Sequence, residues 1–183
     1  MELAFAPRLP ETIPRPHPWV DERTAIALQA SMALYLVQHA RALSEQEDPE
    51  RGISELGRSE VERIASVAKG YGVQVKKILH SDKKRARQTA KILARFLEPS
   101  SVEPASGLHP QDDVTALALA LRSEDDWMIV GHMPFVSKLT SHLVIGRAEP
   151  AIFAFQNGGI VCLEEVPGSD AWVIKWALMP TVR

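Results

Sequence analysis

Short apolar runs alternate with segments of helical periodicity over most of this 183-residue chain. The runs are rich in strand-forming residues, and the segments between them repeat apolar residues every three or four positions. Strands that alternate with helices build a mostly parallel sheet whose two faces are both covered. We therefore predict an α/β fold of three layers, with a mostly parallel central sheet and helices on both faces. The last two strands are joined by the turn-rich sequence PGSD and can form an antiparallel hairpin.

The expected elements follow from this pattern. Ser54 is a suitable N-cap for the first helix, and Gly70 or Gly72 is a suitable stop signal. Pro99 ends the second helix. Leu56, Val61, Ile64, Ala65 and Ala68 form the apolar face expected of the first helix. We expect strands within 33–37, 75–81, 101–105, 127–132, 158–166 and 171–179, and helices within 54–72, 83–98, 112–123 and 134–144.

The first thirty-one residues differ from the rest of the chain. Five prolines stand between Pro7 and Pro18, and each one fixes φ and removes a backbone donor. We predict a poorly ordered proline-rich extension over 1–31, with at most a short helix capped by Asp21, and one domain over 32–183. The extension is either a native arm or the result of an upstream start codon assigned in error. We favour Met32 as the true start, because nothing before it looks necessary to the core.

Composition restricts the partners and the compartment. A formal charge of −2 gives no general attraction to nucleic acid or to an anionic membrane, so neither is predicted as a partner. No stretch approaches the roughly 20 apolar residues needed to cross a bilayer. The N-terminus lacks the features of a secretory signal, and the single cysteine, Cys162, forms no internal disulfide. These features favour a cytoplasmic protein.

Three of the apolar runs end in a histidine, at His39, His80 and His132. In open α/β sheets, ligands bind outside the carboxyl ends of the strands, so such residues can meet in one crevice. The helix after His80 begins with SDKKRARQTA, which places cations where the helix dipole favours an anion. A phosphoryl group there would meet backbone N–H groups and guanidinium together. The residues therefore indicate a phosphate site with two histidines and at least one arginine.

Simpler interpretations exist for each of these signals. A histidine at a strand end is more often a hydrogen-bonded structural residue than a catalyst. The KKRAR cluster of 83–87 is usually a solvated helix face or a weak nucleic-acid patch. Three histidines also suit zinc, but no carboxylate or cysteine stands at the usual ligand spacing, so we predict no metal. The conjunction of these features favours the phosphate site.

The same residues resemble the histidine phosphatase superfamily, which includes the phosphoglycerate mutases, and in particular its small SixA-type phosphohistidine phosphatases. The resemblance extends from Met32 to the C-terminus. LYLVQHARA stands in the place of the strand that ends in Arg-His-Gly, and DPERGISELG matches the segment acid-x-x-Arg-Pro-Leu-Thr/Ser followed by Gly. SDKKRARQTA matches Ser-Pro-x-x-Arg-Ala-x-Gln-Thr-Ala, and VGHMP matches Gly/Ser-His-x-Pro.

This resemblance implies a catalytic set of His39, Arg85 and His132, with Gln38 and Arg51 as substrate-binding residues. His39 is then the nucleophile that becomes phosphorylated, and Arg85 and a protonated His132 supply positive charge without a metal or other cofactor. Gln38 replaces the arginine of the first motif, and Ala40 replaces its glycine. Glutamine brings no charge, so we expect weaker phosphate affinity unless Arg41 or Arg51 restores positive charge to the pocket. Asp82 replaces a proline and is expected to cap the helix.

The implied function is a metal-independent phosphatase that removes a phosphoryl group from phosphohistidine on a protein through a phospho-His39 intermediate. Only 42 residues separate Thr89 from His132, a span where larger relatives carry a lid, so we expect an open cleft suited to a protein substrate. His109, Asp112 and Asp113 are uncertain candidates for a general acid, and the two aspartates also suit the start of a helix. Two alternatives remain: a small-molecule phosphomonoesterase of the same fold, and a catalytically silent phosphate-binding module.

Overall fold

The computed structural model describes residues 33–166, 169 and 171–181. The proline-rich extension, the short helix expected after Asp21 and the proposed start at Met32 lie outside the described residues. Within the described ranges, no helix is long and apolar enough to cross a membrane.

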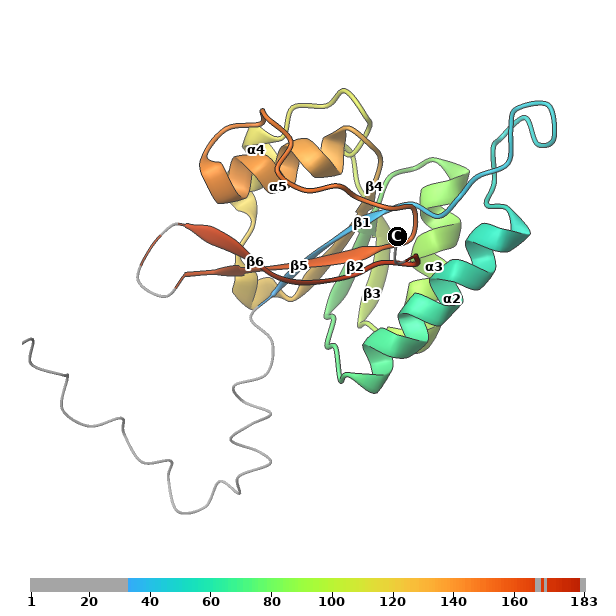
Figure 1. Ribbon diagram of the computed structural model, residues 1–183, viewed down its shortest axis with the longest axis horizontal. Helices are drawn as coiled ribbons and strands as arrows, with labels where there is room; N and C mark the ends of the chain where they lie inside the picture. Colours follow the sequence, from blue (N-terminus) through green and yellow to red (C-terminus); the bar gives the residue numbers. More distant parts are fainter. Residues whose placement is uncertain (1–32, 167–168, 170, 182–183) are drawn as a thin grey trace, which may run out of the picture. The chain divides into compact units, whose positions relative to one another are not determined.

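The described strands form one six-stranded sheet, drawn in Figure 1. Along the sheet their order is β3-β2-β4-β1-β5-β6. The first four in this order run parallel to one another, whereas β5 is antiparallel to both β1 and β6. This arrangement confirms the predicted mostly parallel sheet and its antiparallel final hairpin. The strands are β1 (Leu34–Gln38), β2 (Lys77–His80), β3 (Ser101–Pro104), β4 (Trp127–Gly131), β5 (Ile160–Glu165) and β6 (Trp172–Leu178).

Helices cover both faces of the sheet, as predicted. Helices α2 (Glu55–Gly70) and α3 (Lys84–Leu97) lie against one face, and α4 (Thr115–Ala120) and α5 (Phe135–Ile145) lie against the other (Figure 1). A single 3-10 turn, η1 (Ser123–Asp125), precedes β4.

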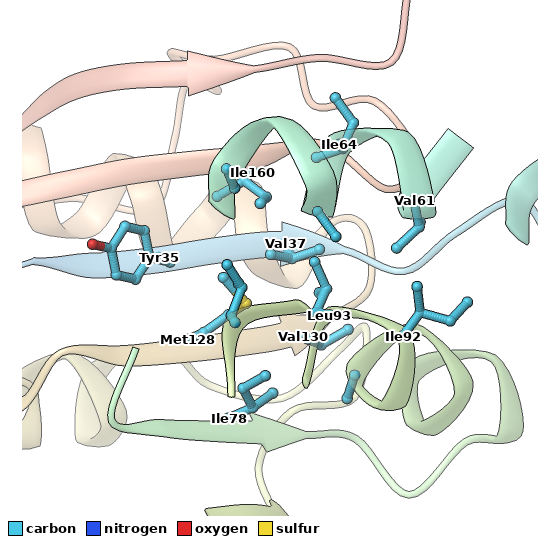
Figure 2. Packing of buried hydrophobic residues seen from close by; sticks show 14 of the residues in the cluster. Tyr35, Val37, Val61, Ile64, Ile78, Ile92, Leu93, Met128, Val130 and Ile160 are labelled. Carbon is cyan, nitrogen blue, oxygen red and sulfur yellow. The ribbon is translucent and has the colours of Figure 1, made fainter. Parts of the chain in front are cut away.

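Each face of the sheet has its own apolar core, because alternate residues of a strand point to opposite faces. Tyr35 and Val37 of β1 belong to the core under α2 and α3, which Figure 2 shows from close by. Leu34 and Leu36 belong to the core under α4 and α5. Since β1 is buried on both faces, its apolar run is continuous rather than alternating.

The start of α2 follows the predicted capping signal. The Ser54 hydroxyl accepts from the backbone N–H of Gly57 at 3.1 Å. A side chain at position 57 would overlap the carbonyl oxygen of Arg41, so only glycine allows this helix to approach the loop after β1 so closely. Leu56 was expected on the apolar face, but its side chain is 60% exposed. It stands in the first turn, before the part of the helix that packs on the sheet.

The third predicted helix is shorter than its pattern indicated. It was expected over 112–123, whereas α4 begins at Thr115 and ends at Ala120. The Asp113 carboxylate accepts from the backbone N–H of Thr115 at 3.0 Å, and the Asp112 carboxylate accepts from that of His109 at 2.7 Å. Both aspartates therefore bind backbone donors in the turn before the helix, because short acidic side chains compete with helical hydrogen bonds.

The connections after β1 and β4 diverge to opposite faces of the sheet. The chain leaves β1 toward α2, and it leaves the neighbouring parallel strand β4 toward α5. Adjacent parallel strands whose connections separate in this way leave a crevice at their carboxyl ends, where ligands bind in open α/β sheets. His39 and His132 are the residues that follow directly after these two strands.

Candidate active site

The two histidines meet in this crevice. The backbone N–H of His39 donates to the carbonyl of Gly131 at 3.0 Å, which extends the β1–β4 pairing by one step. The two imidazole rings lie 4.9 Å apart between centroids, at an angle of 59°. Residues 93 positions apart in the sequence thus share one site, as the strand-end pattern predicted.

The hydrogen bonds of His39 assign its tautomer. Its Nδ1 lies 2.7 Å from the carbonyl oxygen of Ala40, which can only accept, so Nδ1 carries the proton. Its Nε2 accepts from Arg85 Nε at 3.1 Å and therefore presents a lone pair to the guanidinium. Burial lowers the pKa of His39 to about 4, the bond to Ala40 opposes this, and the charges of Arg85 and Arg51 lower it further. The imidazole is consequently neutral at pH 7, with an unprotonated Nε2.

His132 lies deeper in the site than His39. Its side chain is 1% exposed, and its Nε2 lies 2.8 Å from the Ser81 hydroxyl. Its Nδ1 is buried and has no hydrogen-bond partner among the described residues. Burial, followed by the effects of His39 and Arg85, lowers the pKa of His132 to about 3. His132 is therefore neutral at pH 7 in the ligand-free site, because desolvation disfavours the charged imidazole. The protonated His132 expected during catalysis stays a prediction for the substrate-bound state.

A buried threonine joins the loop of His39 to the helix of Arg85. The Thr89 hydroxyl accepts from the backbone N–H of Ala40 at 2.9 Å and donates to the carbonyl of Arg85 at 2.7 Å. The sequence reasoning did not single out Thr89 for this role, although it stands in the matched sequence SDKKRARQTA. The Gln88 side chain, in the same sequence, accepts from the backbone N–H of Ile53 at 2.8 Å. This bond ties the segment just before α2 to helix α3.

The connection before β5 supports His39 from the other side. The Asn157 side-chain amide donates to the carbonyl of His39 at 2.9 Å, and the Gly158 N–H donates to that of Gln38 at 2.8 Å. Neither residue was predicted, because no local pattern links position 157 to a residue 118 positions earlier.

Arg51 and Arg85 line one hollow of about 460 Å³. Arg51 has a positive φ of 52°, which is uncommon for a residue with a side chain. Its charge also lowers the pKa of Arg85, after the larger effect of burial. Lys84 lies in the same hollow but binds Asp48 at 2.9 Å and Glu50 at 3.1 Å. Part of the unfavourable positive charge at the start of α3 is thus neutralised within the chain, and the charge of Arg85 remains available to a ligand.

Gln38 and Arg41, on either side of His39 in the first motif, are directed to different parts of the structure. Gln38 is partly buried at the end of β1, where strand alternation directs its side chain to the face of Leu36 rather than that of Val37. Arg41 does not restore charge to the site, because its Nε pairs with Glu60 at 2.9 Å. That pair is directed toward α2.

His80 and Asp82 do not take the positions expected of them. His80 is buried, and its Nδ1 lies 2.8 Å from the carbonyl oxygen of Ser81, as a structural histidine would. The predicted Asp82 cap is wrong: the residue before α3 is Lys83, and no side chain caps this helix. The Asp82 carboxylate instead lies 2.8 Å from His109 Nε2.

Of the three candidate acids, His109 is the one whose charge acts on His132. It stands next to Asp82, and its charge contributes to the lowered pKa of His132. Asp112 and Asp113 each accept a backbone N–H in the turn before α4, and the bond from Thr115 lowers the pKa of Asp113, which disfavours a proton-donating role for it. Within the described residues, no group of three or more His, Cys, Asp or Glu side chains is arranged to hold a metal ion.

Comparison with known proteins places this geometry in a family. Residues 34–112 match the family model of the histidine phosphatase superfamily, branch 1. The chain is also similar to a solved structure of the protein histidine phosphatase SixA complexed with tungstate, with a TM-score of 0.69 and 26% identity. The chain belongs to the histidine phosphatase superfamily. That alignment covers 81% of this chain and 97% of the SixA chain.

Two further relatives extend the comparison. The phosphohistidine phosphatase SixA of Escherichia coli (strain K12) is 29% identical over 156 residues, which are 81% of this chain and 94% of that protein. A SixA crystal structure from Agrobacterium tumefaciens has a TM-score of 0.66 and 27% identity over 81% of this chain and 97% of its own. Nearly the full length of each relative is therefore matched, and the superfamily fold predicted from the motifs is confirmed.

Proposed function

We propose that this superfamily member is a metal-independent phosphatase that removes a phosphoryl group from phosphohistidine on a protein, through a phospho-His39 intermediate. The observation that carries the proposal is the lone pair of His39 Nε2, which lies 3.1 Å from Arg85 Nε, where both side chains are partly buried. A neutral imidazole with one fixed tautomer, next to a guanidinium, is what an in-line attack on phosphorus requires.

In the first step, His39 Nε2 attacks the phosphorus atom of the substrate. The second ring nitrogen of the substrate phosphohistidine takes a proton from solvent; a bond then forms between His39 Nε2 and phosphorus while the bond from phosphorus to the substrate nitrogen breaks, and neutral imidazole leaves. The backbone carbonyl of Ala40 holds the Nδ1 proton of His39 throughout and stabilises the positive charge that develops on the ring. In the second step, water attacks the phosphorus of phospho-His39, and inorganic phosphate and neutral His39 are released.

Charge on the transferred group is stabilised from several sides. Arg85, which donates to His39, lines one hollow with Arg51, and the two residues contribute two guanidinium groups. The unpartnered Nδ1 of buried His132 is a further group that a phosphoryl oxygen would satisfy. A phosphoryl dianion so close would raise the pKa of His132 and let it accept a proton, so that both ring nitrogens donate. Gln38 is proposed to add a neutral amide donor, which is weaker than the arginine of the first motif.

The choice of phosphohistidine rests on the leaving group. An alkoxide leaving group needs a general acid, but Asp112 and Asp113 accept backbone N–H groups, and the third candidate, His109, lies 2.8 Å from Asp82. Imidazole departs more readily, since the pKa of its conjugate acid is about 6.5. The SixA relatives named above support the same substrate class.

Trapping of the intermediate tests the proposal. Brief exposure to a labelled phosphoryl donor such as phosphoramidate should label the wild-type protein at His39, with the alkali-stable, acid-labile behaviour of a phosphohistidine. His39→Ala should take up no label, whereas Gln74→Ala, a change on the exposed loop before β2, should be labelled as the wild type is. A wild type that takes up no label would favour a silent phosphate-binding module. Faster hydrolysis of a simple phosphate ester than of a phosphohistidine peptide would favour the phosphomonoesterase alternative.

A further inference from the structure

A second hollow lies beside the candidate active site, between α3 and the edge strand β3. Its volume is about 500 Å³. We call it the α3–β3 groove; its lining residues are His80, Asp82, Arg87, Lys91, Ala94, Arg95, Val102 and Pro104. The apolar part of its lining consists of Ala94 from the helix and of Val102 and Pro104 from the strand. Three cationic side chains of α3 also line it.

The three cations stand on one side of the helix because they are spaced by four residues. Arg95 is paired with Glu62 at 2.7 Å. Neither Arg87 nor Lys91 has a carboxylate partner among the described residues, and both are exposed. The groove thus presents two positive charges that the described part of the chain does not neutralise.

The acidic residues near the groove are turned away or already paired. Glu103 neighbours Val102 on β3, but strand alternation places it on the opposite face of the sheet, where it lies 3.4 Å from Lys77. Asp82 at the end of the groove lies 2.8 Å from His109. The charge that would complement Arg87 and Lys91 must therefore come from another molecule.

The groove adjoins the hollow of Arg51 and Arg85. Asp82 lines both the α3–β3 groove and the hollow of Arg51 and Arg85. Moreover, β3 runs parallel to β2 and so ends at the same edge of the sheet as the strands that precede His39 and His132. A chain segment lying in the groove would lead toward the hollow lined by Arg85, whose guanidinium contacts His39.

We propose that the α3–β3 groove docks an acidic segment of the phosphoprotein substrate. Carboxylates of this segment pair with Arg87 and Lys91, and its apolar side chains lie on the apolar lining around Val102. The role in substrate selection rests on the function proposed above, whereas the binding of an acidic segment does not depend on catalysis.

Direct binding tests the groove by itself. The probe is a dye-labelled peptide with several glutamates among small apolar residues, and its partner is the same peptide with glutamine at each glutamate. By fluorescence anisotropy at low salt, the wild type should bind the glutamate peptide more tightly. The double variant Arg87→Glu, Lys91→Glu should weaken this binding about tenfold, the value expected for two exposed charge pairs.

A matched variant separates the groove from net charge. Lys138→Glu, Arg147→Glu makes the same change in charge on and just after α5, on the opposite face of the sheet, and should bind the glutamate peptide as the wild type does. Added salt should remove the preference for glutamate over glutamine, because the Debye length falls to about 3 Å at 1 M. Equal binding of the two peptides by the wild type, or equal losses in the two double variants, would overturn the proposal.

Kinetics then distinguish docking from catalysis. With a phosphohistidine peptide that carries the glutamate segment, the groove variant should raise KM about tenfold and leave kcat unchanged. With phosphoramidate, which is too small to reach the groove, both double variants should match the wild type. A loss of activity on phosphoramidate in the groove variant alone would mean that the changes damage the site, and would contradict a docking role. If the wild type hydrolyses neither substrate, the proposed function fails while the anisotropy result still decides the groove.

Discussion

Replacement of Thr89 by valine tests how much its buried hydroxyl contributes to the stability of the protein and to the alignment of His39. The Thr89 side chain is fully buried, and its hydroxyl binds both the N–H of Ala40 and the carbonyl of Arg85. Valine keeps the shape but removes the hydroxyl, which leaves the N–H of Ala40 buried without its partner. An unpaired buried donor costs about 1–3 kcal/mol, so we expect Thr89→Val to lower the free energy of unfolding by about 2 kcal/mol.

Urea unfolding measures this loss. For a slope of about 2 kcal/mol per molar urea, the midpoint should move down by about 1 M with the slope unchanged. The same change should slow phosphorylation of His39 about tenfold or more, because the carbonyl of Ala40 holds the Nδ1 proton and a small displacement of a reacting group is costly.

Thr89→Ser is the matched control. Serine keeps the hydroxyl and loses one methyl group, which costs about 1 kcal/mol. Serine should therefore destabilise the protein less than valine does and should retain the labelling rate. If serine proves the more damaging of the two, packing rather than the hydrogen bonds holds this junction, and the reasoning is refuted.

Other changes probe the charges and the close contacts of the site. Because the pKa values of His39 and His132 lie at about 4 and about 3, the unfolded chain binds more protons than the folded one below about pH 6.5. Stability should thus fall, by several kcal/mol, as pH drops from 6.5 toward 4 in urea titrations; a flat profile would contradict the neutral imidazoles. Gln38→Arg should tighten inhibition by inorganic phosphate about fivefold, the gain expected when a neutral donor becomes charged, and an unchanged inhibition constant would place position 38 outside the site. Gly57→Ala should cost about 2 kcal/mol by thermal or urea unfolding, since its Cβ would overlap the backbone of Arg41, and wild-type stability would show that the helix can move away.

Much of the fold could be predicted because the local and global signals agree. The run at 33–37 is apolar at every position, and β1 is buried on both faces. The Ser54 cap is likewise local, since it depends on a residue three positions away. The boundaries of α4 were missed because Asp112 and Asp113 prefer backbone donors outside a helix, a choice that depends on the turn at His109.

The site was only partly predictable, for a related reason. Strand ends and motifs were sufficient to bring His39, Arg85 and His132 together as a hypothesis. They could not give the protonation of His132, which depends on how completely its neighbours bury it. Nor could they identify Asn157, whose amide reaches His39 from the other end of the chain. Charge state and distant support are properties of the packed molecule, not of a short sequence.

The position of β1 has a consequence for synthesis on the ribosome. This strand is made first among those described, yet both of its neighbours, β4 and β5, come at least 90 residues later. At a synthesis rate of about 5–20 residues per second, on the order of ten seconds pass between the synthesis of β1 and that of the first strand that pairs with it. During that interval the apolar sequence LYLV is unpaired and exposed in the nascent chain. Expression yield of this protein should therefore respond to temperature and to holding chaperones more than its finished stability alone would suggest.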